Sequence, residues 1–269
     1  MNDTRVFKKT VWNFYKKNKR EFPWRTNCDP YWVLISEIML QQTQVSRALI
    51  KFPEFIESFP TLTSLACATT TQILNAWQGL GYNRRALYLK QIAKIICTQH
   101  DGCIPKDSAK LNQFPGIGPN TAGSIIAFAY NIPIPFIETN IRTVFLHHFF
   151  HGKKNISDAM LMPLITKTLD KKNPREWYWA LMDYGSYLKK QFKNPSRGSR
   201  HHIKQKKFEG SLRQIRGLII KIILKNGALD AKKIAADINR PIPEIQCALD
   251  GLLTENFLVL KRNRYFLLN

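Results

Sequence analysis

The chain has few acidic residues for its length. Its 269 residues include 19 Asp and Glu against 41 Lys and Arg, so the formal net charge is +22 at pH 7 and the pI is near 9.9. A basic excess of this size favours a polyanionic partner, with nucleic acid ahead of an anionic membrane surface. The length also allows a substantial core and two or three compact units.

Cysteine is scarce, and long apolar runs are absent. The five cysteines have no paired spacing, which is typical of a reducing cytosol and indicates neither a disulfide framework nor an obvious metal site. No uninterrupted apolar run reaches the roughly eighteen residues of a membrane-spanning helix. The first ten residues also lack the apolar centre of a signal peptide. We therefore expect a cytoplasmic monomer, from a bacterial or archaeal nucleoid, that contacts no membrane.

A glycine turn at residues 115–118 separates two helical patterns. Gly116 and Gly118 allow close approach of another molecule, and they precede a helix that begins at Pro119. The amide N–H groups at such a helix start bind phosphate. After a proline-broken loop, Glu138 follows. This arrangement could hold a nucleic-acid backbone while a carboxylate acts on one nucleotide, although the glycines on their own favour an ordinary helix–helix turn.

Residues 4–20 and 31–45 show the apolar periodicity of amphipathic helices. Between them, a proline-initiated loop carries Trp24 and Arg25. Glu37 lies within the second helical pattern with apolar neighbours on both sides. Burial would raise the pKa of this carboxyl group. The alternative is a Glu37 that faces the surface or is paired with a cation.

Uncharged polar residues close that helix, and a second glycine turn follows later in the chain. Gln41, Gln42 and Thr43 are rich in donors and acceptors that suit base edges. The turn at residues 79–85 presents Tyr82 and Arg84, among other residues. A tyrosine between glycines and arginines can stack on or wedge between bases, but it can also be a core tyrosine.

The composition changes near the end of the helical region. Residues 157–190 read as further helices and include Asp183, whereas residues 189–207 contain basic residues and no acid. This basic strap includes Lys189, Arg197 and Arg200. A charge run is usually a solvated surface, but the charge of the whole chain favours contacts with phosphate groups.

The C-terminal residues 211–269 form a distinct pattern. Helices are expected at residues 216–225, 230–238 and 243–256, followed by strands at 257–260 and 265–268 around a basic turn. Three helices and a hairpin are the winged-helix pattern. Such a tail can bind DNA or a protein partner, and the sequence leaves both open.

Several of these segments resemble the A/G-specific adenine DNA glycosylases (MutY type) of the helix-hairpin-helix (HhH-GPD) superfamily. The resemblance covers roughly residues 5–190. It rests on motifs that occur in the family order and at the family spacing: Phe22-Pro23-Trp24-Arg25, Ser36–Val45 (SEIMLQQTQV), Gly79–Tyr82, Phe114–Gly118 and Glu138–Arg142. The hairpin alone indicates the superfamily, whereas SEIMLQQTQV is specific to the adenine branch.

The resemblance implies an all-α fold with two lobes and a target adenine flipped into the cleft between them. We expect domain boundaries at 1–188 for the glycosylase domain, 189–210 for the strap and 211–269 for the winged-helix-like domain. The two lobes would comprise about residues 23–132, and 1–22 with 133–188.

The resemblance also implies roles for individual residues. Glu37 falls on the general acid that protonates the adenine ring, and Glu138 on the carboxylate that stabilises the positive charge on the sugar. Asn140 matches a polar residue beside Glu138. The remaining matches are Trp24, Arg25 and Asp183 at the adenine pocket, and Gln42, Thr43 and Tyr82 at positions that probe or wedge the opposite base.

Four departures from the family pattern stand out. The second carboxylate is usually Asp, so Glu138 carries an extra methylene. Position 120 is usually Ser or Tyr, or a Schiff-base Lys in the lyase branch; here it is Asn120, which argues against strand cleavage. The four-cysteine loop for an iron–sulfur cluster is missing, and a cluster requires thiolate ligands. The usual domain for 8-oxoguanine recognition is replaced by the short tail.

These features predict a monofunctional adenine DNA glycosylase without an iron–sulfur cluster, acting on double-stranded DNA at adenine opposite 8-oxoguanine or guanine. One alternative is a thymine or uracil mismatch glycosylase of the same fold. A second is a DNA-binding or damage-sensing protein without catalysis, against which the presence of both carboxylates weighs.

Overall fold

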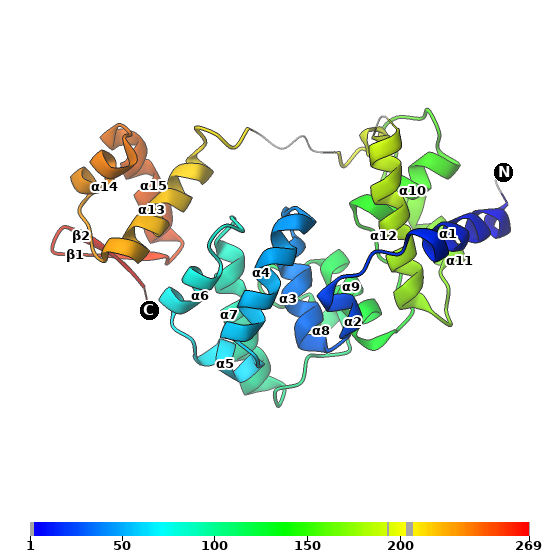
Figure 1. The fold of residues 1–269 in the computed structure, drawn as a ribbon, viewed down its shortest axis with the longest axis horizontal. Coiled ribbons are helices and arrows are strands. Elements are labelled where there is room, and N and C mark those ends of the chain that lie inside the picture. The colour runs from blue at the N-terminus through cyan, green and yellow to red at the C-terminus, as the bar shows by residue number, and fades with distance from the viewer. Residues whose placement is uncertain (1–2, 193, 203–206, 269) are drawn as a thin grey trace. The chain divides into compact units, whose positions relative to one another are not determined.

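The structure, a computed structural model, is mostly helical and describes residues 3–192, 194–202 and 207–268 (Figure 1). The chain divides into two compact units, Met1–Ile38 with Ile104–Lys204, and Met39–Cys103 with Gln205–Asn269. Within the described residues, none of the helices combines the length and apolarity needed to cross a membrane. The lobe and domain boundaries expected from the sequence stay a prediction.

The first unit consists of helices packed through apolar faces. They are α1 (Thr4–Asn18), α2 (Pro23–Thr26), most of α3 (Pro30–Leu40), α8 (Ser108–Leu111), α9 (Pro119–Tyr130), α10 (Thr139–Phe149), α11 (Asp158–Thr168), α12 (Pro174–Gln191) and the 3-10 helix η1 (Pro195–Gly198). Phe145, Trp177 and Tyr178 are completely buried in its core. Rings of this size contribute much of the buried apolar area of a core.

Helices α10 and α12 lie side by side (Figure 1). A Cβ atom added to Gly185 of α12 would clash with the carbonyl oxygen of Asn140, so only glycine permits this approach. The close contact brings the last turns of α12 next to the start of α10, where Glu138 is the N-cap residue.

The second unit contains two helical groups. The first comprises α4 (Val45–Ser58), α5 (Leu62–Cys67), α6 (Thr70–Ala76) and α7 (Arg84–Gln99), and the second comprises α13 (Leu212–Asn226), α14 (Ala231–Ile238) and α15 (Ile242–Thr254). Thr61 and Thr69 form capping boxes at the starts of α5 and α6. Trp77, Phe52 and Phe55 are fully buried beneath these helices.

A two-stranded antiparallel sheet completes the tail. β1 (Leu258–Lys261) pairs with β2 (Arg264–Leu267) in the register Leu258–Leu267 to Lys261–Arg264. The turn residues Arg262 and Asn263 both have positive φ, as a two-residue turn of matching twist requires. The expected succession of three helices and a hairpin is therefore present. Helix α13 starts earlier than expected because Ser211 caps it by accepting the Gln214 N–H.

Three local expectations are wrong. Pro23 does not fix a loop but occupies the first position of the one-turn helix α2, which suits its fixed φ. Residues 41–44 lie beyond α3 rather than within it, and Gln42 has a φ of 58°. Lys189 belongs to α12, so the strap does not begin there as a linker.

The described part of the strap is held against the first unit. Ile156 and Ser199 form a parallel bridge, with N–H groups of Ile156 and Arg200 donating to the carbonyls of Gly198 and Ile156. These backbone bonds fix η1 and its flanks in place. The basic strap residues Lys193, Lys204 and Lys206 lie outside the described residues.

Candidate active site and arginine-lined cavity

Glu37 projects from α3 into a largely apolar environment. Its neighbours Ile35, Ile38 and Met39 are fully buried, while Glu37 keeps partial access to solvent. Burial raises the pKa of Glu37 from 4.5 to about 7. A hydrogen bond from Ser124 and the positive charge of Arg25 oppose the rise, and the negative charge of Glu138 adds to it. Near neutral pH, Glu37 is therefore able to both hold and release a proton.

Ser124 lies within hydrogen-bonding distance of two acceptors. Its single hydroxyl lies 2.6 Å from Glu37 Oε2 and 2.9 Å from the carbonyl oxygen of Thr121. One hydroxyl proton serves only one of these acceptors. When Glu37 is protonated, it donates to Ser124 Oγ, and Ser124 donates to Thr121. Both contacts are then satisfied.

Glu138 caps helix α10. Its Oε1 accepts the N–H of Asn140 at 2.7 Å and the N–H of Ile141 at 2.9 Å. Its Oε2 accepts from Asn140 Nδ2 at 3.3 Å. The N-terminal end of a helix favours a negative charge through its free amides and its dipole. The carboxylate of Glu138 is therefore held at the start of α10 by the first free amides of the helix.

Lys189, from α12, contacts the Asn140 side chain beside Glu138. Its Nζ donates to Asn140 Oδ1 at 2.8 Å. The sequence places Lys189 in a basic strap, whereas the structure brings it to Glu138 and Asn140. We call Glu37, Ser124, Glu138, Asn140 and Lys189 the carboxylate site.

Trp24, Arg25 and Asp183 meet in the same unit. Arg25 forms a bidentate pair with Asp183, with both N–O distances at 3.0 Å, and Arg20 adds contacts to the same carboxylate at 2.7 and 3.0 Å. Trp24 is buried and stacks on Phe22 with the ring centroids 5.2 Å apart. Asp183 is 3% exposed and engaged by two guanidinium groups, so its contacts fix α2 and the segment before it to α12.

Asn120 and the glycine turn lie at the start of α9. Asn120 Oδ1 accepts the N–H of Ile137 at 3.2 Å and so ties the helix start to the segment before Glu138. Gly116 has a φ of 76°, which glycine adopts without strain, whereas Gly118 is an N-cap in extended conformation. Both glycines are exposed, as are Arg197 and Arg200 around η1.

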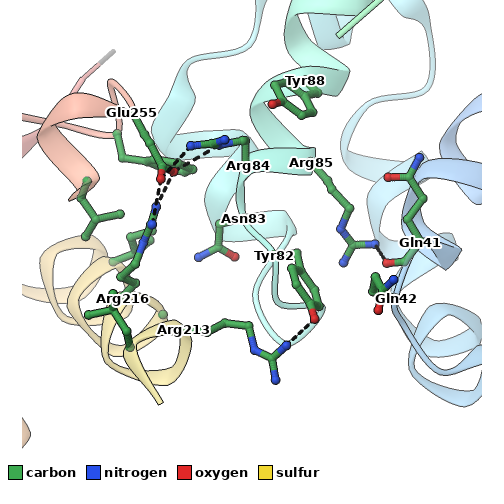
Figure 2. Close-up of a pocket in the computed structure, with 15 residues that line it drawn as sticks. Gln41, Gln42, Tyr82, Asn83, Arg84, Arg85, Tyr88, Arg213, Arg216 and Glu255 are labelled. Atoms are coloured by element: carbon green, nitrogen blue, oxygen red, sulfur yellow. Dashed lines mark hydrogen bonds and ion pairs between the residues drawn. The ribbon is translucent and has the colours of Figure 1, made fainter. Parts of the chain in front are cut away.

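The second unit contains an arginine-lined cavity of about 570 Å³ (Figure 2). Its lining includes the predicted residues Gln41, Gln42, Tyr82 and Arg84 together with Arg85, Arg213 and Arg216. Thr43 lines an adjoining cavity of about 600 Å³, which Gln42 and Tyr82 share. The structure thus brings together the residues expected to contact the opposite base, with helix α13 of the tail as a further wall.

Buried Arg85 holds the two turns of this cavity in place. Its guanidinium donates to the carbonyls of Met39 and Gln41 at 2.8 and 2.5 Å, and to that of Gly81 at 2.9 Å. Gln42 and Tyr82 both have positive φ, at 58° and 49°. Such values cost energy in residues other than glycine and persist only where the surroundings enforce them.

Tyr82 is contacted by the tail. The Arg213 guanidinium donates to the Tyr82 hydroxyl and lies 4.9 Å from the centre of its ring (Figure 2). Glu255 of the tail pairs with Arg84 at 2.7 Å and also with Arg216. Tyr82 is therefore half-buried rather than freely exposed.

Sequence reasoning missed several functional candidates. Ser124 had a weak signal, as a hydroxyl in an apolar helix one turn after Asn120. Arg20 and Arg213 had none, because each contacts a partner more than a hundred residues away. Lys189 was identified as basic but assigned the wrong surroundings.

The described residues contain no cluster of three or more His, Cys, Asp or Glu side chains that could hold a metal ion. Three of the five cysteines lie on three different helices, and the other two lie between helices: Cys67, Cys97 and Cys247, then Cys28 and Cys103. The thiol donors of this chain therefore do not fit the four-cysteine ligand set of the family's iron–sulfur cluster.

Comparison with known proteins identifies the family. The family described as "HhH-GPD superfamily base excision DNA repair protein" matches residues 35–169. An adenine DNA glycosylase of Buchnera aphidicola (subspecies Baizongia pistaciae) is 34% identical over 190 residues, or 69% of this chain and 53% of that protein. One of Mycolicibacterium smegmatis is 40% identical over 159 residues, or 59% of this chain and 52% of that protein. The chain spans about half the length of the curated relatives it matches.

Solved structures show the same fold. A thermostable thymine-DNA glycosylase matches with a TM-score of 0.63 and 22% identity, covering 71% of this chain and 90% of that one. A non-covalent endonuclease III–DNA complex matches with a TM-score of 0.61 and 16% identity over the same shares. Because the sequence identities are this low, these two structures show a shared fold and nothing about a shared substrate.

Proposed function

Because the chain belongs to the HhH-GPD superfamily of base excision DNA repair glycosylases, we propose that it is a monofunctional adenine DNA glycosylase. It removes adenine opposite 8-oxoguanine or guanine by hydrolysis of the N-glycosidic bond and leaves an abasic site. Its homology with adenine DNA glycosylases of 30–40% identity supports the choice of adenine.

The observation that carries the proposal is the difference between the two carboxyl groups. Desolvation raises the pKa of Glu37 to about 7, whereas the carboxylate of Glu138 accepts hydrogen bonds from the first amides of α10. A protonated acid and an ionised carboxylate at one site are what glycosidic cleavage uses.

The two groups act at opposite ends of the breaking bond. Glu37 gives its proton to a ring nitrogen of the flipped adenine, so that the base leaves as a neutral molecule. As the C1′–N bond lengthens, positive charge develops on the sugar. Glu138 stabilises that charge, and water then adds to C1′ and gives its proton to the deprotonated Glu37 carboxylate.

The monofunctional mode rests on Asn120. A strand-cleaving enzyme of this superfamily needs an amine at this position to attack the sugar, and an Asn side chain has none. Asn120 instead accepts the N–H of Ile137 and supports the segment that leads to Glu138. We propose that this is its role in the site, with Asn140 acting beside Glu138.

We also propose that the enzyme works without an iron–sulfur cluster. The segment at the family's cluster loop contains no cysteine, and its described part is tied by backbone hydrogen bonds to Ile156. In this proposal the exposed Arg197 and Arg200, with the amides at Gly116 and Gly118, contact DNA phosphates.

The tail is proposed to be a winged-helix-like domain. Its three helices and one hairpin support this assignment. The tail contributes Arg213 and Arg216 to the arginine-lined cavity, to which α7 contributes Arg84. We propose that this cavity surface binds double-stranded DNA at the mismatch.

Base release from labelled duplexes tests the proposal. The panel contains A:8-oxoG, A:G, A:C, T:G and U:G pairs, with and without alkali to cleave abasic sites. We expect cleavage of the adenine strand, and only after alkali. Cleavage of T:G or U:G duplexes would assign a mismatch pyrimidine substrate instead, cleavage without alkali would reveal lyase activity, and DNA binding without base release on any duplex would support a non-catalytic sensor.

A further inference from the structure

Lys189 lies in an unusual position for a basic surface residue. It is half-buried in the last turn of α12, and its Nζ is 2.8 Å from Asn140 Oδ1. The close approach of α12 to α10 at Gly185, one turn earlier, brings it there. Lys189 therefore has a fixed partner on the helix that Glu138 caps.

The contact determines how the Asn140 amide is oriented. An ammonium group is only a donor, so it requires the carbonyl oxygen of the amide. With Oδ1 facing Lys189, the Nδ2 group faces Glu138 and donates to its Oε2 at 3.3 Å. A hydrogen-bonded chain thus runs from Lys189 through Asn140 to the carboxylate.

The Glu138 side chain must be held in one conformation if its carboxylate is to act on the substrate. Glutamate has one more rotatable bond than the aspartate that the resemblance places at this position, so its oxygen atoms sweep a larger volume. The backbone amides of Asn140 and Ile141 both bind Oε1. This leaves Oε2 as the oxygen that can face the sugar of the substrate. Oε2 accepts a hydrogen bond from the Asn140 side chain.

We propose that Lys189 is a positioning residue that compensates for the extra methylene of Glu138 by locking Asn140, and through it Oε2, in the productive orientation. This inference rests on the proposed glycosylase function. Misplacement of a reacting group by about 1 Å costs on the order of a hundredfold in rate. Loss of the contact between Lys189 and Asn140 should therefore lower the rate of base release measurably.

The charges around Lys189 are consistent with this role. Glu138 and Arg142 are the charged groups that act on it. Burial lowers the pKa of Lys189, and Glu138 opposes that change. Arg142 also lowers the pKa of Lys189, against the effect of Glu138, and is itself paired with Asp158, with both N–O distances at 2.8 Å.

The test is a double-mutant cycle in the full chain, read as single-turnover base release at saturating enzyme on the duplex that the wild type cleaves best. The variants are Lys189→Met, Glu138→Asp and the double variant, with Lys167→Met on α11 as the matched control. Lys167 is exposed and lies on a helix that contributes no residue to the carboxylate site. DNA affinity is measured for each on the same duplex with a non-cleavable adenine nucleotide.

With Glu138 present, Lys189→Met should reduce the rate by about 10- to 100-fold at unchanged DNA affinity. In the Glu138→Asp background, the same change should cost less than about threefold, since the shorter side chain needs no lock; such non-additivity is expected only for coupled residues. The single-turnover rate of Glu138→Asp alone should stay within about tenfold of the wild-type rate. Lys189→Arg, which keeps a donor, should be faster than Lys189→Met.

Three results would overturn the inference. An equal loss in both backgrounds, or an inactive Glu138→Asp variant, would show that no compensation exists. A loss of DNA affinity with an unchanged single-turnover rate would make Lys189 a phosphate contact. A Lys189→Met enzyme as fast as the wild type removes the role while leaving the proposed function intact, whereas a wild type inactive on every duplex removes both.

Discussion

The carboxylate site and the arginine-lined cavity differ in the sign of most of the charged groups that line them: carboxyl groups in the first, guanidinium groups in the second. In the carboxylate site, burial raises the pKa of Glu37 to about 7, and the first amides of α10 bind the carboxylate of Glu138. In the cavity, arginines line the walls and pair with tyrosine, backbone carbonyls and one glutamate. The first arrangement controls a proton, whereas the second suits a polyanion and its base edges. The chain's large positive charge therefore says little about where its chemistry occurs.

The strongest test of this contrast is Glu37→Gln. The amide fills the same space but has no acidic proton, so base release should fall by roughly 10²- to 10⁴-fold while DNA binding is kept. The measurement is single-turnover base release beside an affinity titration. Glu57→Gln, an exposed change on α4, is the control. Near-normal base release by Glu37→Gln would remove Glu37 as the general acid.

Asp183→Asn asks whether the buried ion pairs support the carboxylate site structurally. It leaves Arg25, 8% exposed, and Arg20 without their carboxylate. Breaking a buried pair on one side costs about 3–5 kcal/mol of unfolding free energy, and the partial exposure of Arg20 favours the lower end. Urea denaturation measures this cost, again with Glu57→Gln as the control. A change below about 1 kcal/mol would show that the pairs are not needed for stability.

The pH dependence of base release sharpens the contrast further. Only protonated Glu37 donates a proton, and its raised pKa of about 7 means that this form dominates below neutral pH. The rate should be level below pH 7 and fall about tenfold per unit well above it. Ser124→Ala removes a hydrogen bond that lowers this pKa, so the fall should move to higher pH. A profile that is flat from pH 6 to 9 would contradict the assignment.

The smallest effect is expected in the cavity, from Arg213→Ala. It removes one hydrogen bond and one cation–π contact to Tyr82, together worth about 1–2 kcal/mol. We expect the ratio of A:G to A:8-oxoG cleavage to change by up to about tenfold, with the faster rate preserved. Lys225→Ala, an exposed change on the same helix, is the control. A loss of all base release would mean that the cavity takes part in catalysis.

Much of the fold could be predicted from local patterns. The helix of residues 4–20, the helix from Pro119 and the tail's three helices and hairpin are confirmed, because apolar periodicity, caps and turns depend on near neighbours. The failures are also local in cause. A four-residue helix at Pro23 is too short to show a period, and the positive φ of Gln42 has no sequence signal in a residue other than glycine.

The sequence by itself determined that Glu37 has apolar neighbours along the chain, that a glycine turn would precede a helix, and that the molecule would be strongly basic. Only the tertiary structure decided the partners of these groups. Ser124 reaches Glu37, Lys189 reaches Asn140 and Arg213 reaches Tyr82 across 87, 49 and 131 residues. Hydrogen bonds depend on distances of a few ångströms and on direction. Those distances are set when helices pack, so no pattern within one helix contains them.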